Sequence, residues 1–165
     1  MQDLQVVVDR FMAGEIGSER LPLLAAEALA EGFDSPALRE LAGLSRADVR
    51  EARDLFVRAA RELGAAIPDE DACPEDLVLY WASRMVDGSV GPAAGANCIV
   101  SHGEALGWPD RLSHLLGLAS VWDDWPEGRD ETERSMLAEA RALLAEGLPT
   151  SPHPVLKRST FGRRH

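Results

Sequence analysis

The stretch that decides the fold is residues 74–125, PEDLVLYWASRMVDGSVGPAAGANCIVSHGEALGWPDRLSHLLGLASVWDDW, which contains all four tryptophans and the single tyrosine of the chain. The prolines at positions 74, 92 and 109 suit the first turn of a helix, and the glycines at 88 and 107 suit the residue after one. Between them, apolar residues recur at helical spacing. We therefore predict three consecutive helices, over residues 74–88, 92–106 and 109–125, which build the core.

The middle one of these helices is dominated by small side chains. Ala93, Gly95 and Ala96 lie close to Ile99 in the sequence, and small side chains allow neighbouring helices to approach closely. We expect this helix to lie at the centre of the fold.

The third helix contains Gly117, which costs a helix about 1 kcal/mol relative to alanine. The sequence therefore leaves open whether the third helix is continuous or divided at Gly117.

Glycines that suit helix ends occur seven times along the chain, at positions 14, 32, 43, 64, 88, 107 and 147. No run of alternating β-branched residues bounded by turn signals occurs, which is the pattern that a strand needs. We predict an all-α fold, a compact bundle of about seven short helices that forms a single domain over residues 1–147. Residues 148–165 contain three prolines and four basic residues without an acidic one, and we expect a mobile basic tail.

The charge of the chain limits the kinds of partner it can have. There are 17 basic and 28 acidic residues, a formal net charge of −11. Because the tail holds four of the basic residues, residues 1–147 carry 13 basic and 28 acidic residues, a net charge of −15. A surface of that sign repels phosphate groups, which argues against nucleic acids and anionic lipids as partners. It suits a protein partner with a basic surface, or simple solubility, and the oligomeric state stays open.

The cellular location is indicated by the cysteines and by the start of the chain. Cys73 and Cys98 are too few for the disulfide framework of a secreted protein. The first residues, MQDLQ, lack the basic start of a signal peptide, and no apolar run is long enough to span a membrane. We therefore expect a cytoplasmic protein. We also expect no cofactor. The sequence GSVGP at residues 88–92 is not a phosphate-binding loop, because it lacks the following lysine and the preceding strand of such a loop.

The sequence WDDWPE at residues 122–127 breaks a local rule. Three acids gather where a helix is expected to end, although the C-terminal end of a helix dipole favours cations. Acids flanked by tryptophans are suited to contact a basic protein. We therefore predict a partner-binding surface made of Trp122, Asp123, Asp124, Trp125 and Glu127, in a protein-binding module such as an inhibitor or immunity-type protein. The alternative is that the tryptophans fill the core and the acids are solvated or cap the next segment.

A second hypothesis is a metal-assisted hydrolase that uses His102, His114, Asp123 and Asp124. Histidines on adjacent helices together with a carboxylate pair are typical ligands of a catalytic metal. However, no His-x-x-x-His or Glu-x-x-His spacing occurs, and each histidine borders an apolar stripe. We therefore predict no metal site, and His102 and His114 are the candidate ligands if there is one. Cys98 lies four residues before His102, which allows a thiolate–imidazole pair, although a cysteine in a core helix is usually inert.

The segment ALAEGFDSPALRELAGL at residues 28–44, together with MVDG at residues 85–88 and WDD at residues 122–124, resembles a family of small helical proteins of high-GC actinobacteria whose activity is not assigned. The resemblance covers most of residues 20–146. It implies a single helical domain in the cytoplasm. No activity, cofactor or catalytic residue is carried over from it.

Overall fold

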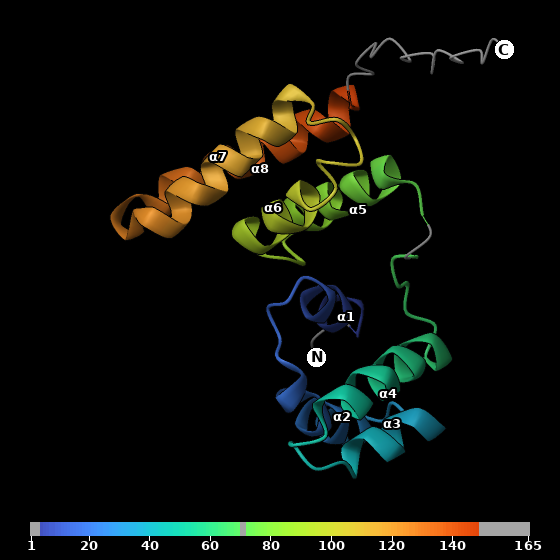
Figure 1. The fold of residues 1–165 in the computed structure, drawn as a ribbon. Helices are drawn as coiled ribbons and strands as arrows, with labels where there is room; N and C mark the ends of the chain where they lie inside the picture. Colours follow the sequence, from blue (N-terminus) through green and yellow to red (C-terminus); the bar gives the residue numbers. More distant parts are fainter. Residues whose placement is uncertain (1–3, 70–71, 149–165) are drawn as a thin grey trace, which may run out of the picture.

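The computed structural model describes residues 4–69 and 72–148, which form helices, turns and loops without any strand (Figure 1). In chain order the elements are α1 (Leu4–Met12), η1 (Ser18–Arg20), α2 (Leu21–Ala30), α3 (Pro36–Ala42), α4 (Val49–Glu62), α5 (Pro74–Val86), α6 (Pro92–Val100), α7 (Asp110–Asp124), η2 (Pro126–Gly128) and α8 (Arg129–Glu146). The all-α class is thus confirmed for the described residues. None of their helices combines the length and the apolar character needed to cross a membrane. The predicted tail lies outside the described residues, except for Leu148.

Eight α-helices occur in the described residues, where the sequence predicted about seven. The boundary between α7 and α8 lies where the helix over residues 109–125 was predicted to end, and Pro126 begins a short 3₁₀ turn there. Proline lacks the N–H that a continuing helix needs, so α7 can end without a glycine in the left-handed conformation. Gly43 follows the end of α3, but its φ is −86°, a conformation that any residue adopts. This helix end therefore does not require a glycine.

α6 is shorter than predicted, because it ends at Val100 and residues 101–107 form turns. Gly107 and Trp108 both have positive φ, 71° and 53°, which reverses the chain. The Trp108 N–H donates to the Gly103 carbonyl at 2.8 Å. The indole of Trp108 lies so close to Gly103 that a β-carbon at this position would overlap it. Gly103 therefore accommodates Trp108, and this contact replaces the last turn of the predicted helix.

The buried apolar side chains form two clusters rather than one core. We call the first the N-terminal cluster; it is built by α1–α4 and includes Val8, Phe11, Leu21, Leu41, Ala52 and Phe56. The second, the C-terminal cluster, is built by α5–α8 and includes Val78, Trp81, Met85, Ile99, Leu115 and Met136. α6 packs on α5, α7 and α8 within the C-terminal cluster. The prediction that this helix lies at the centre of the whole fold is therefore wrong.

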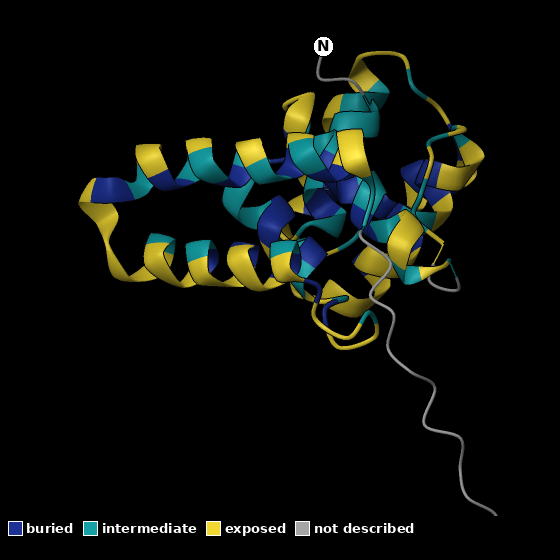
Figure 2. Ribbon diagram, turned by 90° about the horizontal axis from the view of Figure 1, so that it is seen from above, coloured by how far each residue is buried: buried dark blue, intermediate teal, exposed yellow. Residues whose placement is uncertain are grey.

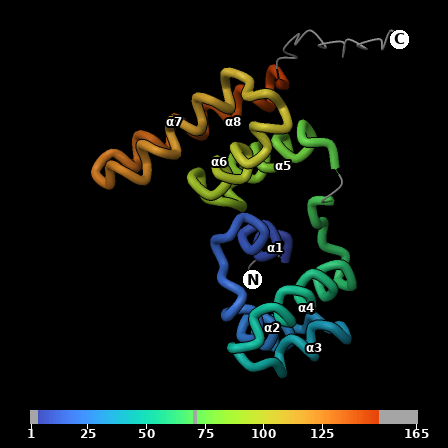
Figure 3. Tube along the Cα trace, viewed as in Figure 1, coloured from blue at the N-terminus to red at the C-terminus, as the bar shows by residue number. Residues whose placement is uncertain are grey.

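α1 belongs to the N-terminal half of the molecule, α1–α4, and lies between α2–α4 and the C-terminal half, α5–α8 (Figure 3). Its Met12 packs against both clusters. The carboxylate of Asp9 in α1 is completely buried. Its Oδ1 accepts hydrogen bonds from Gln5 Nε2, at 2.9 Å, and from the hydroxyl of Tyr80 in α5. On the other side of the carboxylate, Arg84 Nη1 of α5 lies 3.7 Å from Asp9 Oδ2. A buried carboxylate thus connects the N-terminal half to α5.

The phenol of Tyr80 remains protonated in this contact. Burial, reinforced by the hydrogen bond to Asp9, raises its pKa well above the ordinary value. An unpaired buried carboxylate costs several kcal/mol, so the packing of α1 on α5 must keep donors next to Asp9. A second link joins the same halves: the Gly91 N–H at the start of α6 donates to Glu15 Oε1 at 2.8 Å.

α7 and α8 pack side by side as a hairpin whose far end extends beyond α5 and α6 (Figure 2). α7 is continuous through Gly117, which resolves the question that the sequence left open. It buries a single stripe of side chains, Leu112, Leu115 and Ala119. Leu116 and Val121, which the sequence pattern placed in apolar stripes, are instead 41% and 43% exposed. The hairpin consequently extends its tip, residues 122–128, beyond α5 and α6, and only Trp122 at the base of the tip packs against the C-terminal cluster.

Two helix-interior glycines provide a matched test of this packing. Gly117 is exposed, and a β-carbon there would have no neighbour within 4 Å, so Gly117→Ala should raise the free energy of unfolding by about 1 kcal/mol. Gly95 in α6 lies against Met85, whose side chain would overlap a β-carbon. Gly95→Ala should therefore lower the free energy of unfolding despite the same gain in helix propensity. Urea denaturation distinguishes these outcomes, and effects of the same sign would contradict the packing described.

The contact between the two halves is tested by Tyr80→Phe, which removes only the hydroxyl that donates to Asp9. Because a buried carboxylate loses a donor, we expect the free energy of unfolding to fall by about 1.5–3 kcal/mol. Ser83→Ala is the control, since it removes a hydroxyl of the same helix that donates only to the Tyr80 carbonyl, at 2.8 Å. Urea denaturation should show a larger loss of unfolding free energy for Tyr80→Phe than for Ser83→Ala. Equal losses would contradict the conclusion that the hydrogen bond to the buried Asp9 carboxylate contributes more than an ordinary one.

Candidate functional site

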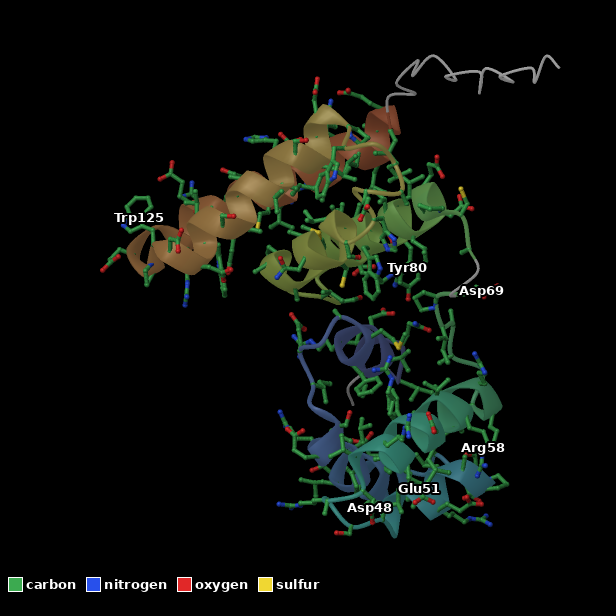
Figure 4. The ribbon with its side chains drawn as sticks, in the orientation of Figure 1. Asp48, Glu51, Arg58, Asp69, Tyr80 and Trp125 are labelled. Atoms are coloured by element: carbon green, nitrogen blue, oxygen red, sulfur yellow. The ribbon has the colours of Figure 1, made fainter. Side chains whose placement is uncertain are left out.

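The tip of the hairpin brings the predicted contact residues together at the end of α7 and the start of η2. Trp125 is 53% exposed, more than any other large apolar side chain in the described residues. It lies at the outer end of the hairpin (Figure 4). Gly128 is buried beside it, and a β-carbon on Gly128 would overlap the Trp125 indole. The indole is therefore held against the backbone of the turn while much of its surface stays open to solvent.

Trp122 has a different environment from Trp125, although the sequence placed both in the contact surface. Its side chain is half-buried, and its Nε1 donates to Glu133 Oε1 of α8 at 2.9 Å. The guanidinium carbon of Arg129 lies 4.1 Å from the centre of the Trp122 ring, a favourable cation–π distance. Trp122 thus joins α7 to α8 and supports the tip.

The three acids of the tip are exposed and unpaired. Asp123, Asp124 and Glu127 form no ion pair or side-chain hydrogen bond within the part of the chain that the structure describes. The cation that the C-terminal end of α7 favours comes from α8, because Arg129 Nε donates to the Trp122 carbonyl at 3.2 Å. The three carboxylates are therefore free to meet a positively charged group from outside.

The residues of the hydrolase hypothesis are not brought together. His114 lies in the second turn of α7, and its Nδ1 is 2.9 Å from Glu139 Oε1 of α8. Asp123 and Asp124 lie nine and ten residues further along the same helix, at least about 13 Å away along its axis. His102 is half-buried in the turns after α6. Among the described residues, no three His, Cys, Asp or Glu side chains are placed to hold a metal ion.

The ionisation of Cys98 and His102 does not suit a thiolate–imidazole pair. Burial, with a smaller contribution from the charge of Glu15, raises the pKa of the Cys98 thiol to about 11. Burial also lowers the pKa of His102. At neutral pH the folded state therefore favours a neutral thiol and a neutral imidazole, which is the opposite of an activated cysteine.

Comparisons with known proteins do not assign a function to this site. No family model, no curated protein and no solved structure matches the chain. The resemblance to small helical actinobacterial proteins stays a prediction, and the function must be argued from the contacts of the chain itself.

Two features of the structure could not be found by reading the sequence. One is the buried Asp9, which occupies an unremarkable position in an amphipathic helix and meets Tyr80 from 71 residues away. The other is a cavity of about 150 Å³ in the N-terminal half, because its lining comes from α1, α2, α3, α4 and the loop before α3. Only a long-range packing arrangement produces either of them.

The two tryptophans of the tip should differ in their effect on stability. Trp122→Ala removes a half-buried ring together with its contacts to Glu133 and Arg129, and we expect a loss of about 2–4 kcal/mol of unfolding free energy. Trp125→Ala removes a mainly exposed ring and should change it by less than about 1 kcal/mol. Urea denaturation checks the difference. A larger loss for Trp125→Ala would mean that Trp125, and not Trp122, supports the tip.

Proposed function

We propose that the protein is an acidic protein-binding module, of the inhibitor or immunity type, whose partner presents a basic surface to the hairpin tip. The observation that carries the proposal is the exposed Trp125 next to three unpaired carboxylates on a projecting hairpin. Tryptophan is enriched among the residues that dominate binding energy in protein interfaces. The surrounding acids select for a partner with lysines or arginines at the rim of the contact.

The arrangement of the tip supports a rigid contact. Trp125 is held by Gly128, and Trp122 is held by Glu133 and Arg129, so little side-chain freedom remains to be lost on binding. Cationic groups approaching Asp123, Asp124 and Glu127 would also be attracted by the overall net charge of −11. Long-range attraction of this kind raises the association rate more than the final affinity.

A cytoplasmic location belongs to the same proposal. Cys73 and Cys98 are both free thiols, as is usual in a reducing compartment. A basic partner in the cytoplasm that requires an inhibitor, such as a nuclease or toxin with a cationic active surface, has the complementary charge. No contact in the described residues favours the hydrolase hypothesis over this one.

The proposal predicts two separable losses of binding. With full-length protein as bait, Trp125→Ala should weaken the complex with the captured partner by about 30-fold or more, as expected for a central aromatic anchor. The triple variant Asp123→Asn, Asp124→Asn and Glu127→Gln should mainly slow association, and added salt should reduce the wild-type association rate toward that of the variant. Surface plasmon resonance at several salt concentrations measures both effects.

A matched control changes the net charge by the same amount at another place. Asp48→Asn, Glu51→Gln and Asp54→Asn alter three exposed acids at the start of α4, far from the tip (Asp48 and Glu51 in Figure 4). This variant should keep most of the association rate and all of the affinity. The proposal is wrong if the partner binds the tip variants as tightly as it binds the wild type. It is also wrong if the α4 control weakens binding as much as the tip triple variant.

A further inference from the structure

The cavity in the N-terminal half is lined mainly by apolar side chains. They come from α1 (Leu4, Val7), α2 (Leu24, Ala25, Ala28), the loop before α3 (Phe33), α3 (Leu38) and α4 (Phe56). The ring of Phe56 is fixed from behind by Phe11, with the ring centres 4.8 Å apart and the planes at 63°. The volume is about 150 Å³, and apolar cavities of this size accept a benzene-sized molecule.

Two carboxylates mark the opening of this cavity. Glu27 and Glu31 complete its lining, and both residues are exposed to solvent. They are four residues apart, so they lie on the same side of the helix. Neither forms an ion pair or a side-chain hydrogen bond within the described ranges.

The end of α2 makes this opening more negative. Glu27 lies in the last turn of α2 and Glu31 is the residue that caps it, and this turn contains no basic residue. The C-terminal end of a helix dipole is itself negative and favours cations. Two acids, a negative helix end and an apolar interior therefore meet within one small cavity, and together they specify a ligand with an apolar body and a positive charge.

We propose that this cavity binds a small organic ammonium compound whose apolar body is about the size of a benzene ring. The ring would occupy the space between Phe33 and Phe56, and the ammonium group would remain at the opening between the carboxylates of Glu27 and Glu31. This site lies in the N-terminal cluster, whereas the hairpin tip belongs to α7 and α8. The inference therefore does not depend on the proposed protein-binding function.

Three probes of nearly the same shape separate the contribution of charge from that of the apolar cavity. Benzylammonium, benzyl alcohol and benzoate are titrated at millimolar concentrations into the ¹⁵N-labelled full-length protein, and binding is followed by the amide resonances of residues that line the cavity. Benzylammonium should bind about threefold to tenfold more tightly than benzyl alcohol, since exposed ion pairs contribute modestly. Benzoate should bind most weakly. The proposal is overturned if benzyl alcohol binds as tightly as benzylammonium, or if no cavity resonance moves.

Variants of the site test the same two contributions. Glu27→Gln with Glu31→Gln should reduce the affinity for benzylammonium to about that for benzyl alcohol, whereas Glu51→Gln with Glu104→Gln, which removes two exposed charges elsewhere, should leave it unchanged. Equal losses in the two double variants would show that only the overall charge matters, and would overturn the site.

Filling the cavity gives an independent readout. Ala28→Leu places extra atoms where the ligand ring would lie and should abolish binding of benzylammonium and benzyl alcohol alike. Ala26→Leu adds the same atoms on the exposed side of α2 and should preserve binding. Binding that survives Ala28→Leu in a folded protein would overturn the proposal. If Ala28→Leu does not fold, the glutamine variants still decide the question.

Discussion

The contact between Asp9 and Tyr80 is the constraint on which the rest of the structure depends. The described residues form two apolar clusters, and the buried side chains of each come from one half of the chain, residues 8–60 or residues 78–143. Two residues of α1 fix the clusters relative to each other, Met12 and above all the buried Asp9 carboxylate, and Glu15 in the turn after α1 adds its hydrogen bond from Gly91. A charge removed from water needs its donors in place, so this polar contact tolerates fewer alternative arrangements than an apolar surface does.

The two candidate surfaces lie in different halves and use charge in the same way. At the hairpin tip, free carboxylates surround an exposed indole; at the N-terminal cavity, free carboxylates border an apolar interior. Each combines an apolar anchor with a negative rim near the C-terminal end of a helix, α7 or α2. In both places the acids occupy a position that the helix dipole disfavours. This placement lowers the stability of the fold, so folding alone does not explain it.

The candidate site was predicted only in part, because the sequence cannot distinguish a supporting tryptophan from an exposed one. Trp122 and Trp125 are three residues apart and looked equivalent in the pattern WDDW. Glu133 and Arg129, which hold Trp122, come from the next helix, and their role follows from the angle at which α8 returns along α7. The exposure of Trp125 has the same origin, since among residues 4–69 and 72–148 no third helix covers the end of the hairpin.

The sequence by itself determined the helical class and most helix boundaries, because these depend on local rules. Glycines with positive φ at positions 32, 64, 88 and 147 lie at helix ends as predicted, and prolines 36, 74 and 92 lie in first turns. The tertiary structure alone decided the division into two clusters, the early end of α6, the burial of Asp9 and the cavity next to Glu27 and Glu31. These features depend on contacts between residues far apart in the chain, and such contacts leave no periodic signal in the sequence.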